Sequence, residues 1–373
     1  MRIGFDAKRL FLNNRGLGNY ARNLLYGLEK YYPEHDYLLF TPRISNEYVS
    51  PILLKSDNII VNMPQGLAKH ATSYWRSFKL GSEAQKNKLN IYHGLAQELP
   101  RDIMKSKAGS VVTIHDMIFL QHPEFYKPID RWIYYNKVKF AVHNADVVVA
   151  ISHQTQNDLV EEFNISEDRI KVIYQSCNEI FYSKRTASEL KAVKEKWSLP
   201  DSFLLYVGAL NENKNVAIIL AALNELKGKS DLPLVVVGNG DAYKKKMIDY
   251  AHQHGLQSQL IFASEVANPS PRELSAFYQL ASVFIFPSFY EGFGIPILEA
   301  RFSGTPVIAS DSSCLDEAGG DSTLYFNPQH TADLAEKITT ALDTEIYHDV
   351  ENFKIDRLIN KLMGVYLEIQ EAK

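Results

Sequence analysis

The sequence predicts an α/β protein of two domains, each built on a parallel β-sheet with helices on both faces. The chain has 373 residues, which is more than one ordinary hydrophobic core holds. Short apolar runs alternate with amphipathic stretches along nearly its whole length, the pattern of repeated β-α units. Several of these runs are continuously apolar, as expected for strands that are buried on both faces.

The predicted strands form two series. The first series is Arg2–Asp6, Tyr37–Thr41, Ile59–Asn62, Ile91–His93, Val111–Ile114, Val147–Ile151 and Lys171–Tyr174. The second series is Phe203–Val207, Leu234–Val237, Gln259–Phe262, Val283–Phe286, Pro306–Ala309 and Thr323–Phe326. Helical patterns lie between most of them, for example at Leu17–Tyr32, Ser152–Phe163, Val216–Leu226 and Thr331–Leu342.

The break between the two series predicts the domain boundary. The segment Ser183–Trp197 is polar and helical without a strand pattern, and Phe203 then opens the second series. We therefore expect an N-terminal domain at residues 1–182 and a C-terminal domain at residues 183–348. A long helical stretch, residues 349–373, follows the last strand and is expected to return to the first domain.

The composition is that of a globular protein, with 46% hydrophobic and 23% charged residues. No run approaches the roughly 18–20 apolar residues that span a bilayer. The first residues enter a strand directly instead of forming a signal peptide. Cys177 and Cys314 are expected to be buried thiols outside any disulfide framework. Together these features favour the cytoplasm.

Charge is distributed unevenly along the chain. Residues 1–182 carry 22 Lys and Arg against 19 Asp and Glu, a balance of +3, and the remainder carries 18 against 25, a balance of −7. A basic N-terminal half could face an anionic acceptor or a membrane surface. Ordinary surface variation is the alternative.

The strongest functional pattern directly follows the predicted strand Val283–Phe286 and reads Tyr-Glu-Gly-Phe-Gly-Ile-Pro-Ile-Leu-Glu over residues 290–299. Open parallel sheets bind ligands at the carboxyl ends of their strands. The glycines allow backbone to approach a ligand, and Pro296 suits the start of a helix, whose N-terminus attracts a diphosphate. Glu291 and Glu299 can each accept hydrogen bonds from the paired hydroxyls of a sugar or a ribose.

This stretch resembles the signature of the GT4 family of retaining glycosyltransferases, and the runs Gly304–Ala309 and Leu315–Gly320 continue the resemblance. The family has the GT-B fold, in which two Rossmann-like domains face each other across a cleft. The resemblance implies that Glu291 binds the hydroxyls of the donor sugar and that Glu299 binds the ribose. It also implies backbone contacts to the sugar and diphosphate from Gly292, Phe293 and Gly294.

A second loop follows the predicted strand Phe203–Val207 and contains Gly208 and Lys214. Lys214 can place a compact positive charge on a phosphate. The loop resembles the family pattern G-x-x-x-x-[RK]-K-[NG], but many members have arginine where this chain has Ala209 and Asn213. The diphosphate would then depend on Lys214 and backbone N–H groups, or on a basic residue from another loop.

Two further signals lie in the N-terminal half. Gly16 and Gly18, in the stretch from Arg15 to Tyr20, match the glycine-rich first loop of the family, which approaches the donor diphosphate or the acceptor. The first strand ends about ten residues earlier, which is too far for a dinucleotide-binding fingerprint. A plain helix start is the alternative for both glycines.

The other signal is a set of polar residues that directly follow predicted strands. The resemblance places His115 beside the donor sugar, as a catalytic residue with Lys214 and Glu291. Asp116 could orient that imidazole or meet the acceptor. His93 could line the acceptor side, although a structural role is favoured for it.

The sequence predicts no metal cofactor. No Asp-x-Asp triplet follows a predicted strand, and no His and Cys cluster has metal-ligand spacing. Lys214 and a helix dipole would neutralise the leaving diphosphate instead.

Two segments of the N-terminal half are both basic and aromatic, Lys69–Lys88 and Lys127–Lys139. They could contact a lipid-linked acceptor and the anionic inner face of the membrane, as a peripheral protein does. A loop and an ordinary amphipathic helix are the alternative.

These signals predict retaining transfer of a hexose from a nucleotide-diphosphate sugar to a glycan or lipid-linked oligosaccharide. The motifs look most like those of bacterial mannosyltransferases of polysaccharide assembly, so GDP-mannose is the first choice of donor and a UDP-hexose the second. The resemblance implies that the leaving diphosphate oxygen helps deprotonate the acceptor, so no general base is assigned. A nucleotide-sugar epimerase and a non-catalytic sugar-nucleotide-binding protein are the alternatives.

Overall fold

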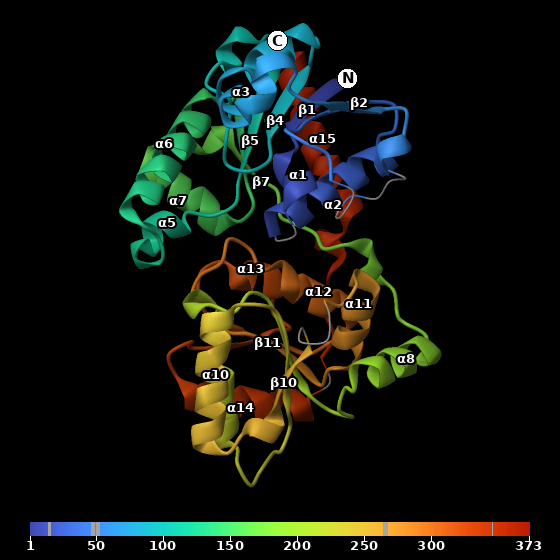
Figure 1. Ribbon diagram of the computed structural model, residues 1–373, viewed down its shortest axis with the longest axis vertical. Helices are drawn as coiled ribbons and strands as arrows, with labels where there is room; N and C mark the ends of the chain where they lie inside the picture. Colours follow the sequence, from blue (N-terminus) through green and yellow to red (C-terminus); the bar gives the residue numbers. More distant parts are fainter. Residues whose placement is uncertain (14–15, 46–48, 50–52, 264–267, 345) are drawn as a thin grey trace. The chain divides into compact units, whose positions relative to one another are not determined.

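The computed structural model describes residues 1–13, 16–45, 49, 53–263, 268–344 and 346–373, and Figure 1 shows its helices and strands. They form two compact units, Met1–Ser176 with Asn352–Lys373, and Cys177–Glu351. The second unit starts earlier than the boundary predicted at residue 183. The reason is the short 3₁₀ helix η6 (Glu179–Tyr182), in which Tyr182 stacks on Phe302 with ring centroids 4.1 Å apart.

The N-terminal unit contains a seven-stranded parallel sheet in the order β3-β2-β1-β4-β5-β6-β7. Its strands are β1 (Arg2–Asp6), β2 (Asp36–Phe40), β3 (Ile59–Asn62), β4 (Ile91–Gly94), β5 (Gly109–Ile114), β6 (Val147–Ala150) and β7 (Ile170–Val172). The register at the centre pairs Ile3 with Tyr37 on one side and with Ile91 on the other.

Helices pack against both faces of this sheet because successive residues of each strand point to opposite sides. They are α1 (Lys8–Leu12), α2 (Gly16–Tyr31), α3 (Thr72–Phe78), α4 (Leu80–Lys86), α5 (Ile118–Gln121), α6 (Pro128–Asn144), α7 (His153–Phe163) and α15 (Ile355–Glu371). The hydrophobic cluster on one face includes side chains from α1, α2 and α15. The cluster on the other face includes side chains from α3 to α7.

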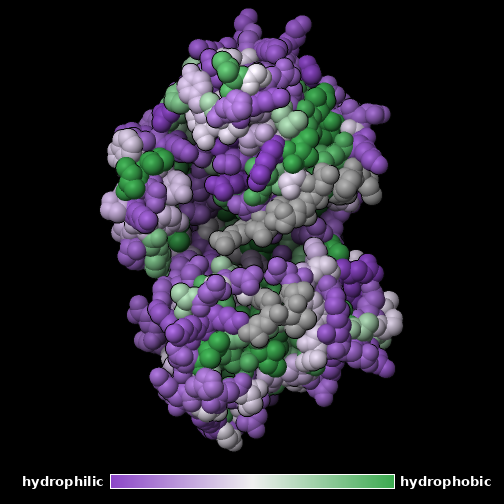
Figure 2. Space-filling model, in the orientation of Figure 1, coloured by the Kyte–Doolittle hydropathy of each residue, from purple (hydrophilic) through white to green (hydrophobic). Residues whose placement is uncertain are grey.

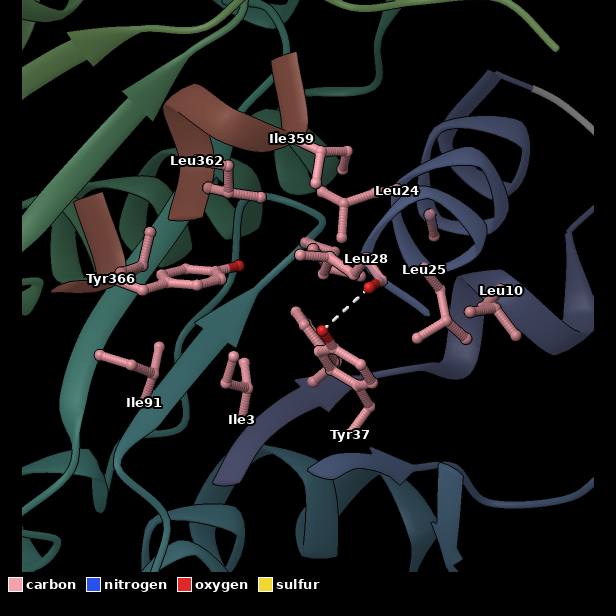
Figure 3. Packing of buried hydrophobic residues seen from close by; sticks show 14 of the residues in the cluster. Ile3, Leu10, Leu24, Leu25, Leu28, Tyr37, Ile91, Ile359, Leu362 and Tyr366 are labelled. Carbon is pink, nitrogen blue, oxygen red and sulfur yellow. Dashed lines mark hydrogen bonds between the residues drawn. The ribbon is translucent and has the colours of Figure 1, made fainter. Parts of the chain in front are cut away.

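The C-terminal helix α15 contributes to the N-terminal core, as predicted. Leu362 and Tyr366 of α15 lie in one cluster with Leu24 and Leu28 of α2, and Figure 3 shows these side chains directed at one another above the sheet. In the same view the buried hydroxyl of Tyr37 donates to the carbonyl of Leu28 at 3.0 Å. The N-terminal core is therefore completed by the last residues of the chain.

The C-terminal unit contains a six-stranded parallel sheet in the order β10-β9-β8-β11-β12-β13. Its strands are β8 (Leu204–Val207), β9 (Leu234–Val237), β10 (Leu260–Phe262), β11 (Val283–Phe286), β12 (Val307–Ser310) and β13 (Leu324–Phe326). Its helices are α8 (Ala187–Trp197), α9 (Ala217–Glu225), α10 (Asp241–His254), α11 (Pro271–Leu280), α12 (Ile295–Ser303), α13 (Leu315–Gly319) and α14 (Thr331–Asp343).

Both units therefore have the predicted architecture, and every predicted strand is present to within one or two residues. Cys177 and Cys314 are both buried, and neither forms a disulfide bond. Within the described residues, no helix combines the length and the apolarity needed to cross a membrane.

Candidate functional site

The site is built where the strand order of the C-terminal sheet reverses. β8 lies beside β11 at the centre of this sheet, and β9 and β12 continue it in opposite directions. In sheets of this type ligands bind outside the carboxyl ends of the strands at this switch point. The loop after β8 carries Lys214 and the loop after β11 carries Glu291. The topology thus brings together two residues that are 77 positions apart in sequence.

Lys214 and Glu291 form an ion pair between the ammonium group and the carboxylate. Their side chains are only 19% and 15% exposed, so solvent screens the pair less than it would a surface pair. The Nζ of Lys214 also lies 5.9 Å from the ring centroid of Phe286, the last residue of β11. The two residues that sequence reasoning assigned to the diphosphate and the sugar are therefore in direct contact.

Asn213, one of the positions where many family members have arginine, is buried and joins the two loops. Its side-chain amide donates to the carbonyl of Tyr290 at 2.9 Å, and its own carbonyl accepts from the amide of Phe289 at 2.8 Å. This position therefore serves loop-to-loop hydrogen bonding and does not present a charge to a ligand. Sequence reasoning missed this role because the two loops are distant in the chain.

At two glycines of the site, a larger residue would have a strained backbone and would come too close to a neighbouring side chain. Gly208 has φ +157°, and a Cβ there would lie 2.6 Å from the hydroxyl of Tyr206. Gly294 has φ +105° as the N-cap of α12, and a Cβ there would lie 3.0 Å from Leu315. Glycine is therefore suited to both positions, and Gly294 brings the loop into the N-terminus of α12.

The loop that carries Glu291 is held by residues that sequence reasoning missed. The amide of Glu291 donates to the Oγ of Ser313 at 3.1 Å, and the thiol of Cys314 donates to the carbonyl of Glu291 at 3.2 Å. Both partners come from the segment between β12 and α13. The backbone on either side of the Glu291 side chain is therefore held by these two hydrogen bonds.

Glu299 lies on α12 and is half-buried. Its Oε2 accepts a hydrogen bond from the hydroxyl of Tyr278 at 2.8 Å. Burial raises the pKa of Glu299 to about 7, and the hydrogen bond from Tyr278 opposes that rise. Hydroxyl groups that donated to this carboxylate would favour its charged form. The arrangement suits a ribose diol, the partner that the family resemblance implies.

Gly16 and Gly18, which the sequence matched to a glycine-rich loop, lie in the first turn of α2 and have different environments. Gly18 is buried in α2, and a Cβ there would lie 1.9 Å from the carbonyl of Asn13. Gly16 is exposed, and a Cβ there would meet nothing within 4 Å. Packing therefore explains Gly18 without a ligand. Arg15 lies outside the described residues.

His115 is buried, and both of its ring nitrogens have partners. Nε2 lies 2.8 Å from the carbonyl of Leu95, so it carries the proton. Nδ1 then accepts from the side-chain amide of Gln175 at 3.0 Å. Burial lowers the pKa of His115 to about 4. The imidazole is therefore neutral at physiological pH, so a role beside the sugar would be that of a neutral group.

His93 has an interior position. The residue is fully buried, with Nδ1 2.6 Å from the hydroxyl of Tyr366 and Nε2 2.8 Å from the hydroxyl of Thr113. Burial lowers the pKa of His93 to about 3. Direct contact with an acceptor is not available to it in this arrangement, and the structural alternative fits. Asp116 is half-buried and accepts from the amide of Ile118 at 3.2 Å, at the start of α5.

Comparison with known proteins identifies the families that the chain matches. The family described as Glycosyltransferase Family 4 matches residues 14–178, and the family described as Glycosyl transferases group 1 matches residues 188–354. The chain belongs to the glycosyltransferases, since both of its halves match models of such enzymes. Its two matched regions correspond to the N-terminal and C-terminal Rossmann-like units.

Several curated relatives of this glycosyltransferase are mannosyltransferases. The serotype-specific mannosyltransferase WbdA of Escherichia coli is 31% identical over 251 residues, which cover 64% of this chain and 30% of WbdA. The O-antigen chain mannosyltransferase B of E. coli is 28% identical over 267 residues, which cover 70% of this chain and 67% of that protein. The match thus spans less than a third of WbdA and two thirds of the second relative.

Solved structures show the same GT-B fold. A glycosyltransferase from Rickettsia africae has a TM-score of 0.75 at 18% identity, with 100% of this chain and 99% of that chain covered. HepE from Anabaena, solved in complex with UDP-glucose, has a TM-score of 0.69 at 18% identity, with 100% and 98% covered. Because the likeness extends over the full chain, the predicted fold class is confirmed.

Proposed function

We propose that this glycosyltransferase moves mannose from GDP-mannose to a glycan or lipid-linked acceptor with retention of configuration. A UDP-hexose is the second choice of donor. The observation that carries the proposal is the contact of Lys214 with Glu291 at the switch point of the C-terminal sheet, with Glu299 on the helix that follows. The mannosyltransferase names of several relatives support the choice of sugar.

In this proposal the site residues divide the donor among them. Lys214 and the N-terminus of α12 stabilise the negative charge that develops on the leaving diphosphate. Glu291 accepts hydrogen bonds from the sugar hydroxyls, and Glu299 accepts them from the ribose. The leaving diphosphate oxygen takes the proton of the acceptor hydroxyl on the same face of the sugar. The neutral imidazole of His115 is compatible with a mechanism that needs no protein base.

Release of the nucleotide diphosphate tests the choice of donor. The protein should release GDP from GDP-mannose faster than it releases UDP from UDP-glucose. Water or an added mannoside serves as the acceptor of the sugar. Faster release of UDP would favour the second choice of donor, a UDP-hexose. Release from neither donor, with any acceptor tried, would contradict the proposed reaction.

We expect turnover to be independent of divalent metal ions. Among the described residues, no group of three or more His, Cys, Asp or Glu side chains could hold a metal ion. Lys214 and the helix N-terminus supply the positive charge that a metal would otherwise provide. Turnover with and without EDTA should be equal. A loss of activity in EDTA that Mg²⁺ or Mn²⁺ restores would refute metal independence.

The N-terminal unit has exposed apolar side chains on two helices that also carry basic residues. Trp132 and Ile129 on α6 are 65% and 59% exposed, and Tyr74 on α3 is 55% exposed. Hydrophobic side chains reach the surface over α6 in Figure 2. Glu98 links the helices, since it pairs with Arg76 of α3 and Lys137 of α6. This surface supports the proposed contact with an anionic membrane and a lipid-linked acceptor.

The protein should therefore bind anionic vesicles, and binding should weaken as the salt concentration rises. Replacement of both Ile129 and Trp132 with serine should reduce co-sedimentation with phosphatidylglycerol vesicles, because it removes the apolar part of the surface. Lys191→Ala, on the exposed face of α8, is the matched control and should bind as the wild type does. Equal binding to neutral and anionic vesicles at low salt would count against this surface.

A further inference from the structure

The two side chains assigned to the diphosphate and the sugar are each other's partners. Lys214 and Glu291 form a shielded ion pair. The pair is electrically neutral as long as both groups remain charged. A ligand that binds the ammonium group of Lys214 must therefore separate this group from Glu291. The carboxylate then needs a new partner.

The inference rests on the proposed function and deepens it. We propose that Glu291 competes with the nucleotide diphosphate for Lys214, so that the site favours the sugar-bearing donor over the nucleotide diphosphate product. Glu291 then has two functions. It binds the sugar, and it weakens binding of the product once the sugar has left.

The charges of the two ligands explain this preference. When a bare nucleotide diphosphate takes Lys214, Glu291 becomes a shielded carboxylate near an anion, with no ligand hydroxyl to donate to it. An unpaired charge in such a place is unfavourable, and the like charge of the diphosphate adds repulsion. When the donor binds, its sugar hydroxyls replace the ammonium at Glu291 while Lys214 turns to the diphosphate. Both side chains then keep a partner.

The backbone around the pair makes the competition unavoidable. The loop of Glu291 is held at its amide by Ser313 and at its carbonyl by Cys314. The loop of Lys214 is held by Asn211, whose Oδ1 accepts from the amide of Lys214 at 3.2 Å. Asn213 joins the two loops. The carboxylate therefore cannot withdraw with its loop, and the pair can open only by rotation of the two side chains.

The ion pair and a role of Glu291 at the sugar alone predict different affinities for the bare nucleotide diphosphate. If Glu291 contacted only the sugar, its loss would leave the affinity for bare nucleotide diphosphate unchanged. The ion pair predicts instead that the affinity rises when the carboxylate is neutralised, because Lys214 no longer has a competing anion. The sign of the change thus distinguishes the two accounts.

Calorimetric titration of Glu291→Gln with GDP and with UDP tests the proposal. The variant should bind the better of the two nucleotides about tenfold more tightly than the wild type, the smaller effect typical of one interaction with a charged group. Glu212→Gln is the matched control. Glu212 lies in the loop of Lys214 and pairs with Lys246 at the surface, where their side chains are 62% and 65% exposed. Its neutralisation should leave the affinity unchanged.

Equal or weaker nucleotide binding by Glu291→Gln would overturn the competition. Lys214→Ala, titrated in parallel, separates this failure from failure of the proposed function. If Lys214→Ala weakens binding while Glu291→Gln does not strengthen it, the donor site stands and the competition is wrong. If the wild type binds neither nucleotide, both proposals fail. Glu291→Asp, which keeps the charge, should show less tightening than Glu291→Gln, and equal tightening would also overturn the proposal.

Discussion

Lys214→Ala should lower turnover by about 100-fold or more, since removal of one preorganised group from a developing anion has effects of this size. The structure explains why no neighbour in the loop would compensate. Ala209 has an uncharged side chain, and Asn213 is buried and hydrogen-bonded to the loop of Glu291. The measurement is the rate of nucleotide diphosphate release at saturating donor.

Lys246→Ala provides the control for this variant. Lys246 is an exposed cation of the same unit, paired at the surface with Glu212, and its loss should change turnover by less than about twofold. Turnover of Lys214→Ala within about fivefold of the wild type would correspond to less than about 1 kcal/mol of transition-state stabilisation. That result would mean that the diphosphate is held elsewhere.

Glu299→Ala should weaken the nucleotide diphosphate and the full donor by a similar factor, because both carry the ribose. Loss of a hydrogen bond to a charged group is worth about 1.5–3 kcal/mol, or tenfold and more in affinity. Calorimetric titration with both ligands measures the two factors. A variant that weakens the donor alone would assign Glu299 to the sugar instead. The contrast with Glu291→Gln, which should tighten the bare nucleotide, makes the two glutamates distinguishable in one experiment.

Glu299 should also make nucleotide binding depend on pH. Burial raises the pKa of its carboxyl group to about 7. Hydroxyl donors favour the charged carboxylate, so binding should release a proton, and affinity should rise as the pH increases through 7. Glu299→Gln cannot ionise at this position and should lose that part of the pH dependence. Titration of the nucleotide itself is common to both proteins, so the difference between them isolates Glu299. Identical pH profiles would contradict the assignment.

The sequence predicted the fold well because the patterns that indicate strands and helices are local. Each strand of the two sheets is a short apolar run, and runs such as Val283–Phe286 and Leu234–Val237 are fully buried on both faces. The start of the last helix was less predictable. Residues 351–353 form a short 3₁₀ turn, and α15 begins only at Ile355. Ser176 holds this turn by donating to the carbonyl of Phe353 at 2.6 Å, a contact that no local pattern reveals.

The site was only partly predictable, because contacts between distant segments leave no local pattern in the sequence. Glycines, prolines and glutamates after a strand are visible in the sequence, and the structure places Glu291 and Lys214 together. Their ion pair and the bridging role of Asn213 depend on two loops that meet only in the folded unit. Ser313 and Cys314 carry no motif that marks them as supports of the Glu291 backbone.

Thermal unfolding with added nucleotides tests the central claim most directly, namely that the C-terminal unit holds a sugar-nucleotide site formed by Lys214, Glu291 and Glu299. The panel consists of GDP, UDP, dTDP and their sugars. A ligand held at 100 times its dissociation constant should stabilise the protein by about 2.7 kcal/mol. We predict this stabilisation with GDP-mannose, and its loss at the same concentration in a Lys214→Ala, Glu299→Ala double variant. No stabilisation by any member of the panel, or the same stabilisation in the double variant, would contradict the account.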